Sequence, residues 1–227
     1  DNGEWLQVDK IGHMTSSYYA GVVGIKAYKW AGFNRKQSIW FGGLTGSFFL
    51  SIIEILDGTT KEWGASAGDF FANTAGSLMA ISQAYKWDEQ RIFLKYSYSP
   101  THYPLINPDQ LGSNNLERIL KDYNGQTYWI TFNIKSLFNI DNSFVPNWLS
   151  FAFGYSADNM ITPYPNYEEI YNKRKRQYLF SFDVDLSKVK TKNKLMNNIL
   201  HTFGFLKFPT PAIEFTNGRI CFHPIYY

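Results

Sequence analysis

The pattern of apolar and polar positions changes once along the chain, near Trp87. Before this residue, apolar and small side chains recur at helical spacing, whereas beyond it they alternate with polar side chains as in β-strands. We therefore expect an α+β fold, with an N-terminal three-helix bundle over residues 1–88 packed with a C-terminal antiparallel β-sheet region over residues 89–227.

Three helices are expected in the first region, over residues 9–30, 37–57 and 68–85. Small residues at helical spacing in the first helix let another helix approach closely. The run from Gln37 to Ile53 carries no charge, and its seventeen residues are just short of the roughly 20 that span a membrane. We favour a buried or partly lipid-contacting helix here, with a membrane span as the alternative. The small residues of the first helix are Ser16, Ala20, Gly24 and Ala27.

A polar cluster is expected at one end of this bundle. Short connections make consecutive helices antiparallel neighbours, so the start of the first helix, the end of the second and the start of the third come together. Within each helix, spacings of three or four residues place the polar side chains on one face. The residues at these three places are Asp9, Lys10, His13, Glu54, Asp57, Asp69 and Asn73.

The cluster has three interpretations. A structural network is favoured, in which Lys10 neutralises carboxylates and Asp69 caps the third helix. A divalent metal site is the second, with His13, Glu54, Asp57 and Asp69 as candidate ligands, or a carboxylate that orients His13 as a general base. The third is binding of a polar ligand or partner. No motif of a named chemistry is present, so catalytic residues are not assigned and a divalent metal is the one candidate cofactor.

Six segments of the second region alternate as strands do. One face of each is aromatic and the other is small or polar, which is the pattern of a transmembrane β-barrel. A soluble antiparallel sheet with one buried face has the same alternation. Six strands are fewer than the usual minimum of eight, which weakens the closed-barrel alternative relative to a membrane-embedded partial barrel, although neither is excluded. The segments are 91–98, 127–135, 148–156, 177–186, 211–215 and 218–227.

Two further segments are candidates for contact with a membrane surface. Lys173, Arg174, Lys175 and Arg176 form a run of four bases. A solvated loop is the simpler interpretation, and contact with anionic headgroups or lipopolysaccharide phosphates is the alternative. A short amphipathic helix near residues 192–206 is expected to lie at a membrane interface or to pack on the sheet.

Composition narrows the function classes. Aromatic residues make up 19% of the chain and charged residues 18%, against about 25% charged in typical soluble domains, which indicates an interface with lipid or with a large partner. The net charge of +3 argues against a nucleic-acid partner. A lone cysteine, Cys221, excludes an internal disulfide and a CxxC metal motif.

Three motifs of the first region carry a family resemblance. They read DKIGH, EILDG and EWGASAGDFFANTAG. In order and spacing they resemble the YfiM-like periplasmic lipoproteins of Gram-negative bacteria over residues 9–84 and, more distantly, the VanZ-like integral membrane proteins. The resemblance implies a location in the cell envelope, either outer membrane or periplasm, no settled activity, and a long form with a β-rich extension. Because no cysteine near Asp1 can carry a lipid, we expect any anchor to be of another kind.

We therefore expect a non-enzymatic, outer-membrane-associated accessory subunit of an outer-membrane assembly or transport complex. Its expected partners are outer-membrane lipids or lipopolysaccharide and envelope proteins, with no nucleic acid. One alternative is an enzyme acting on a lipid or cell-wall substrate through metal-dependent or acid–base chemistry. The other alternative is a soluble periplasmic binding module. The enzyme would work at Asp9, His13, Glu54, Asp57 and Asp69.

Overall fold

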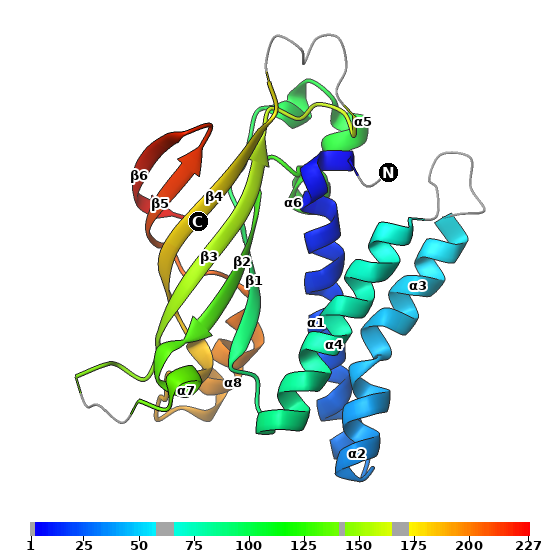
Figure 1. The fold of residues 1–227 in the computed structure, drawn as a ribbon, viewed down its shortest axis with the longest axis vertical. Helices are drawn as coiled ribbons and strands as arrows, with labels where there is room; N and C mark the ends of the chain where they lie inside the picture. The colour runs from blue at the N-terminus through cyan, green and yellow to red at the C-terminus, as the bar shows by residue number, and fades with distance from the viewer. Residues whose placement is uncertain (1–2, 58–65, 141–143, 165–172) are drawn as a thin grey trace. The chain divides into compact units, whose positions relative to one another are not determined.

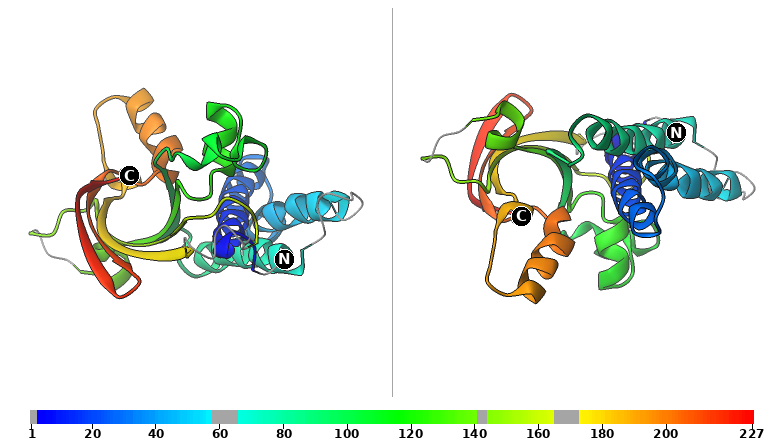
Figure 2. Two further views of the ribbon diagram at one scale, coloured as in Figure 1. Left: turned by 90° about the horizontal axis from the view of Figure 1, so that it is seen from above. Right: turned by 90° about the horizontal axis from the view of Figure 1, so that it is seen from below.

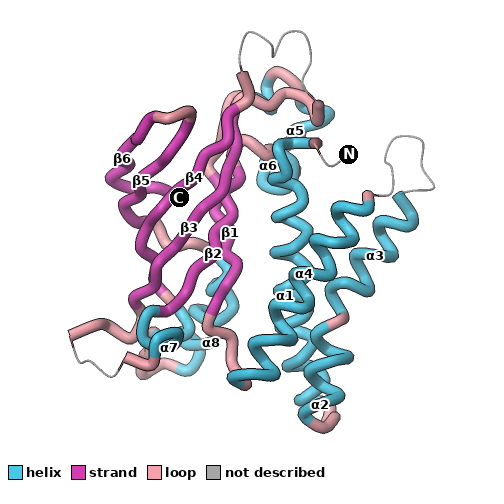
Figure 3. The backbone as a smooth tube through the Cα atoms, viewed as in Figure 1, coloured by secondary structure: helices cyan, strands magenta, loops and turns pink. Residues whose placement is uncertain are grey.

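The computed structural model describes residues 3–57, 66–140, 144–164 and 173–227. The chain separates into two compact units, a helical unit over Asp1–Gln90 and a sheet unit over Arg91–Tyr227. Figure 3 shows that the long helices belong to the first unit and the strands to the second. The expected α+β fold is confirmed.

The helical unit contains the three expected helices. The second of them is continuous through a π-helical turn, so three short elements together form one helix. Asn34 caps its start by a capping box with Gln37, and Ser66 caps the last helix by accepting a hydrogen bond from the backbone of Asp69. The elements are η1 (Glu4–Gln7), α1 (Val8–Trp30), α2 (Arg35–Gln37), η2 (Ser38–Gly42), α3 (Thr45–Asp57) and α4 (Ala67–Trp87).

Close backbone contacts hold these helices together. A Cβ atom at Gly24 would collide with the carbonyl oxygen of Gly42, and one at Gly46 would collide with that of Ser17. The small-residue contact of α1 therefore exists, but the predicted stripe was partly wrong. Ser16 and Ala27 are exposed, because the buried face of α1 runs through Ser17, Gly21 and Gly24.

The interior of the helical unit contains polar as well as apolar side chains, while much of its surface is apolar. The hydroxyl oxygens of Ser17 and Ser77 lie 3.0 Å apart, and Ser47 Oγ donates to the carbonyl oxygen of Asn73 at 2.9 Å. By length and composition, Arg35–Leu56 is a candidate membrane span, and only 28% of its most apolar stretch is buried. Its exposed side chains include Phe48, Phe49, Ile52, Ile53, Ile55 and Leu56.

The sheet unit is a strongly curled antiparallel sheet with strands in sequence order (Figures 1 and 2). All six strands predicted from the alternation are present. The strands are β1 (Ile92–Tyr98), β2 (Gln126–Asn133), β3 (Leu149–Asp158), β4 (Lys175–Val184), β5 (Thr210–Thr216) and β6 (Arg219–Tyr226). The short helices between them are η3 (Tyr103–Leu105), α5 (Pro108–Leu111), α6 (Asn115–Lys121), α7 (Ile134–Phe138), η5 (Leu186–Lys188), α8 (Lys194–Thr202) and η6 (Phe203–Phe205).

The sheet is not closed into a barrel. Among the described strands, β1 and β6 are the two edges and do not pair with each other. The closed-barrel alternative was therefore wrong, as the small number of strands already indicated. Part of the β1 edge is met by the loop before β5, where Lys207 N donates to Tyr96 O at 2.9 Å.

Curvature gives the sheet a concave and a convex face with different chemistry. Trp129 of β2 and Tyr226 of β6 make an edge-to-face ring contact with centroids 5.7 Å apart, although three strands separate them in the sheet. Because residues on strands so far apart can touch only across the inside of a curled sheet, Trp129 and Tyr226 lie on its concave face. This face is buried and, apart from an apolar cluster around Trp129, lined by polar side chains, which include Thr127, Thr131, Asn133, Ser150, Ser156, Ser181 and Asp183.

The convex face carries the aromatic side chains. Phenylalanine rings contact one another across neighbouring strands, with centroids 6.0 Å apart for Phe132 and Phe153, 5.2 Å for Phe153 and Phe180, and 5.6 Å for Phe151 and Phe182. Phe153 and Phe182 are nearly half exposed. The alternation thus has its polar side buried and its aromatic side exposed.

Candidate functional site

The predicted polar cluster of the helical unit forms in space. Lys10 of α1 is its centre. The ammonium group lies 2.8 Å and 2.9 Å from the two carboxylate oxygens of Asp69 at the start of α4, and it donates to Ser66 Oγ at 3.1 Å. Asp9 lies at the edge of this group, 3.8 Å from the same ammonium. The start of α1 and the start of α4 therefore meet through an ion pair with little exposure to solvent.

His13 joins all three helices. Its Nδ1 lies 3.3 Å from Asn73 Oδ1 of α4 and 3.6 Å from Glu54 Oε1 of α3, while Nε2 lies 4.0 Å from Asp9 Oδ1. Glu54 also accepts a hydrogen bond from the backbone of Ser66 at 3.4 Å. Glu54, Ser66 and Asn73 are buried.

Six of the seven predicted cluster residues thus come together. The seventh, Asp57, is the last residue of α3, and its side chain lies outside the described residues. The six were predictable because they depend only on helical spacing and on antiparallel neighbours.

The cluster has some features of a metal site. Asp9, His13 and Asp69 each offer one ligand atom, and these atoms lie within 4.8 Å of one another. Glu54, a candidate ligand, is not in this group. Lys10 contacts both oxygens of Asp69, so a cation already neutralises that carboxylate. This favours the charge-balanced network, and the metal role stays a prediction.

A second charged cluster lies in the sheet unit, on the concave face. Lys95 of β1 forms an ion pair of 2.6 Å with Asp183 of β4, and Lys207 lies 3.9 Å from the same carboxylate. The exposed fractions are 2% for Lys95, 1% for Asp183 and 4% for Lys207. Lys207 Nζ lies 4.9 Å from the centre of the Trp129 ring, within the range of a cation–π contact.

Hydrogen bonds complete this second cluster. Lys207 Nζ donates to Thr210 Oγ1 at 2.7 Å and to Phe208 O at 2.8 Å, and Lys95 Nζ donates to Val184 O at 3.0 Å. Burial lowers the pKa of Lys207 to about 8, since Asp183 opposes this shift only in part and Lys95 adds to it. The two buried lysines therefore share one carboxylate, which fastens β1, β4 and the loop before β5.

This cluster was not predicted from the sequence. Asp183 and Lys95 have a detectable signal, because both lie on the polar side of an alternating strand. Lys207 has none, since it lies in a loop and reaches the carboxylate only through the curvature of the sheet.

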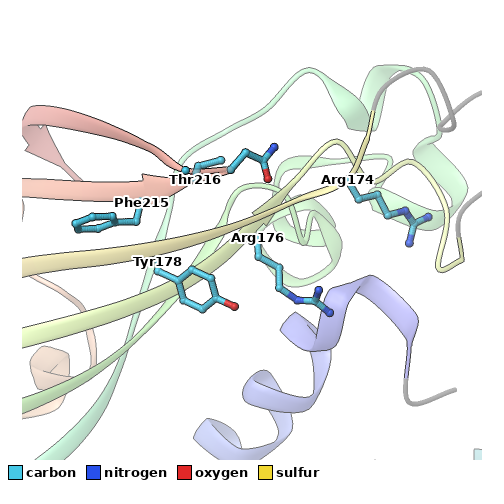
Figure 4. A pocket seen from close by; sticks show the side chains of 7 residues that line it. Arg174, Arg176, Tyr178, Phe215 and Thr216 are labelled. Carbon is cyan, nitrogen blue, oxygen red and sulfur yellow. The ribbon is translucent and has the colours of Figure 1, made fainter.

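The basic run at the start of β4 is divided between different environments. Arg174 donates to the carbonyl oxygens of Thr162 and Pro163 at 2.6 Å and 2.7 Å, and Lys173 is exposed. Two cavities lie at this end of the sheet. Arg174 and Arg176 line one of about 330 Å³, shown in Figure 4, and Lys175 lines another of about 440 Å³.

Comparison with known proteins gives one match. Residues 1–84 match a family model described as a predicted periplasmic lipoprotein, DUF2279. No curated protein and no solved structure matches the chain. The finer YfiM-like and VanZ-like resemblances stay predictions. The helical unit is thus similar to a family of predicted periplasmic lipoproteins, and the protein is envelope-associated, in the periplasm or outer membrane of a Gram-negative bacterium.

Proposed function

We propose that this protein is a non-enzymatic accessory subunit whose curled sheet lies in the outer membrane, with its convex face against lipid. The observation that carries the proposal is the distribution of side chains on the sheet. Aromatic rings are exposed on the convex face, while polar side chains and charged groups that include Lys95, Asp183 and Lys207 are buried on the concave face. A sheet in water normally has the opposite arrangement, whereas a transmembrane barrel places apolar side chains outward.

The extent of the convex apolar surface supports this proposal. Phe153 of β3, Phe182 of β4 and Phe222 of β6 are 48%, 46% and 66% exposed. Burial of apolar surface is worth about 25 cal/mol per Å², so an aromatic face of this kind is costly in water. Large exposed apolar patches mark contacts with a membrane or a partner protein.

Strand length also supports a membrane location. β3 and β4 have ten residues each, which is within the roughly 9–11 residues of a tilted membrane-spanning strand. The other described strands have seven or eight residues. The lengths of β3 and β4 therefore match the thickness of the bilayer core. The sheet is open at its edge strands β1 and β6.

Two features support an accessory role rather than catalysis. An open sheet whose edge strands do not pair with each other leaves backbone groups that a barrel would satisfy by closure. In the polar cluster of the helices, meanwhile, the carboxylate of Asp69 is already paired with Lys10. We therefore propose that envelope proteins and outer-membrane lipids or lipopolysaccharide complete the surface of this subunit.

Detergent dependence tests the membrane location. We expect the purified full chain to precipitate or form large aggregates once detergent is removed, and to float with phosphatidylcholine vesicles in a density gradient. Replacement of Phe153, Phe182 and Phe222 together by serine should reduce flotation, whereas Ala152→Ser on the concave face should not. A chain that is monodisperse without detergent would contradict the proposal and favour a soluble periplasmic binding module.

A second candidate function is a metal-dependent enzyme at the helical cluster. The proximity of ligand atoms from Asp9, His13 and Asp69 is the observation that favours it. Metal analysis of the purified protein and the variant His13→Ala distinguish the two functions. Bound metal that is lost in the variant supports the enzyme. A metal-free protein in which the variant lowers only the thermal stability supports the structural network.

A further inference from the structure

We propose that the cavity beside Arg176 binds the phosphate group of an anionic phospholipid, whose acyl chains continue over the convex face of the sheet. This inference rests on the proposed membrane location and adds a defined lipid site to it. It also separates the four bases at the start of β4, because it assigns the phosphate contact to Arg176 and not to Lys175.

The convex face changes its chemistry in a fixed order along β3 and β4. Stacked phenylalanine rings come first, and the pair Tyr155 and Tyr178 follows, with ring centroids 5.6 Å apart. Arg176 is next along β4, and its Nε donates to Tyr155 Oη at 3.2 Å. The order of apolar rings, tyrosines and a cation matches the order of acyl chains, interface and phosphate layer in a leaflet.

The cavity of about 330 Å³ lies at this transition. Figure 4 shows Arg176 and Tyr178 on β4 and Phe215 and Thr216 on β5, while the side chain of Arg174 extends away from Phe215. Arg176 lines it with a guanidinium group whose Nε donates to the neutral hydroxyl of Tyr155. Guanidinium groups are well suited to phosphate because their N–H groups form paired, charge-assisted hydrogen bonds. The guanidinium group of Arg176 therefore suits the phosphate of an anionic headgroup.

The aromatic lining favours a lipid over a soluble phosphate. Phe215 is half exposed and lies on the convex face, where Tyr178 is its cross-strand partner. A phosphate bound here would have acyl chains directed over the same rings. A soluble phosphate would leave those rings in water and gain nothing from them.

Lys175 provides the matched control. It neighbours Arg176 in the sequence, but successive side chains of a strand point to opposite faces. Lys175 lines the other cavity together with Glu214 and Arg219. Replacing Lys175 or Arg176 by glutamine removes the same charge from the same segment, on opposite faces of the sheet.

The test is lipid retention by the full chain in a non-ionic detergent. The protein is mixed with phosphatidylglycerol and phosphatidylcholine of identical acyl chains, and retained lipids are counted by native mass spectrometry. The wild type should prefer phosphatidylglycerol. Arg176→Gln should reduce this preference about tenfold, the effect of one charge-assisted hydrogen bond, and Lys175→Gln should leave it unchanged. Equal effects of the two variants would overturn the site.

Two further measurements use only the wild type, in case the arginine variant does not fold. Soluble glycerol phosphate should fail to displace phosphatidylglycerol, and displacement at equal concentration would overturn the lipid assignment. The preference should fall between about 0.1 M and about 1 M salt, over which the Debye length falls from ~10 Å to ~3 Å, and a preference that salt leaves unchanged would also overturn it. Failure to float with neutral vesicles would instead contradict the membrane location itself.

Discussion

The buried charges of the sheet unit give the most quantitative prediction. Asp183→Asn keeps the shape of the side chain but removes the charge that Lys95 contacts at 2.6 Å and Lys207 at 3.9 Å. Both lysines would remain almost completely buried. Removing one partner of a buried ion pair costs about 3–5 kcal/mol, because the other charge is left uncompensated.

Of the two lysines, Lys95 should lose more of its stabilising contacts in Asp183→Asn. Lys207 keeps its hydrogen bonds to Thr210 and to the carbonyl oxygen of Phe208, whereas Lys95 keeps the one to the carbonyl oxygen of Val184. The double variant in which Asp183 becomes leucine and Lys95 becomes methionine should therefore recover much of the lost stability, since apolar replacement of a buried pair is often neutral.

Thermal unfolding in detergent, followed by circular dichroism, measures the effect. A loss of 3–5 kcal/mol lowers the melting temperature of a chain of this size by about 10–15 °C. The control is Asp88→Asn, which breaks an exposed ion pair with Arg35 and should change the melting temperature little, because exposed ion pairs are screened by solvent. A shift for Asp183→Asn no larger than that of the control would refute the argument that this carboxylate fastens the sheet.

Three further predictions follow from the same contacts. Burial lowers the pKa of Lys207 to about 8 from 10.5, so the unfolded chain binds more protons than the folded chain between these pH values. The free energy of unfolding should therefore rise with pH in this range, by up to about 3 kcal/mol. In Lys207→Met the melting temperature should depend less on pH, and a wild-type melting temperature that does not change over this range would contradict the pKa shift. A Cβ at Gly154 would lie 2.7 Å from the indole of Trp129, so Gly154→Val should destabilise the protein by about 1–3 kcal/mol and alter its tryptophan fluorescence. An unchanged melting temperature would contradict this and show that the neighbouring side chains move to make room for the larger residue. Lys10→Met leaves the buried carboxylate of Asp69 without its ion pair and should cost about 3 kcal/mol in the same unfolding assay, whereas a neutral effect would remove the network interpretation of the helical cluster.

The local elements were largely predictable from the sequence. Alternation identified all six strands because a strand has a period of exactly two, and capping residues such as Asn34 and Ser66 marked helix starts. The convergence of Lys10, His13 and Asp69 followed from antiparallel neighbours. These features depend on short-range geometry, which the residue pattern records directly.

Other features depend on long-range geometry that the pattern does not record. Alternation is the same whether the polar or the aromatic face is buried, so the exposure of Phe153 could not be decided from it. Lys207 reaches Asp183 only because the sheet curls. The packed stripe of α1 includes Ser17 rather than Ser16, since a one-position change of helical phase is small on the sequence pattern but decisive for contact.

The central claim is that the convex face of the sheet is in contact with lipid. Nitroxide labels placed one at a time along β3, from Leu149 to Asp158, in a chain with Cys221→Ser and reconstituted into phospholipid vesicles, measure collision with oxygen and with a water-soluble nickel complex. We expect oxygen collisions to alternate with a period of two and to be highest at Phe151 and Phe153. Equal access of the nickel complex to these two positions would contradict the claim.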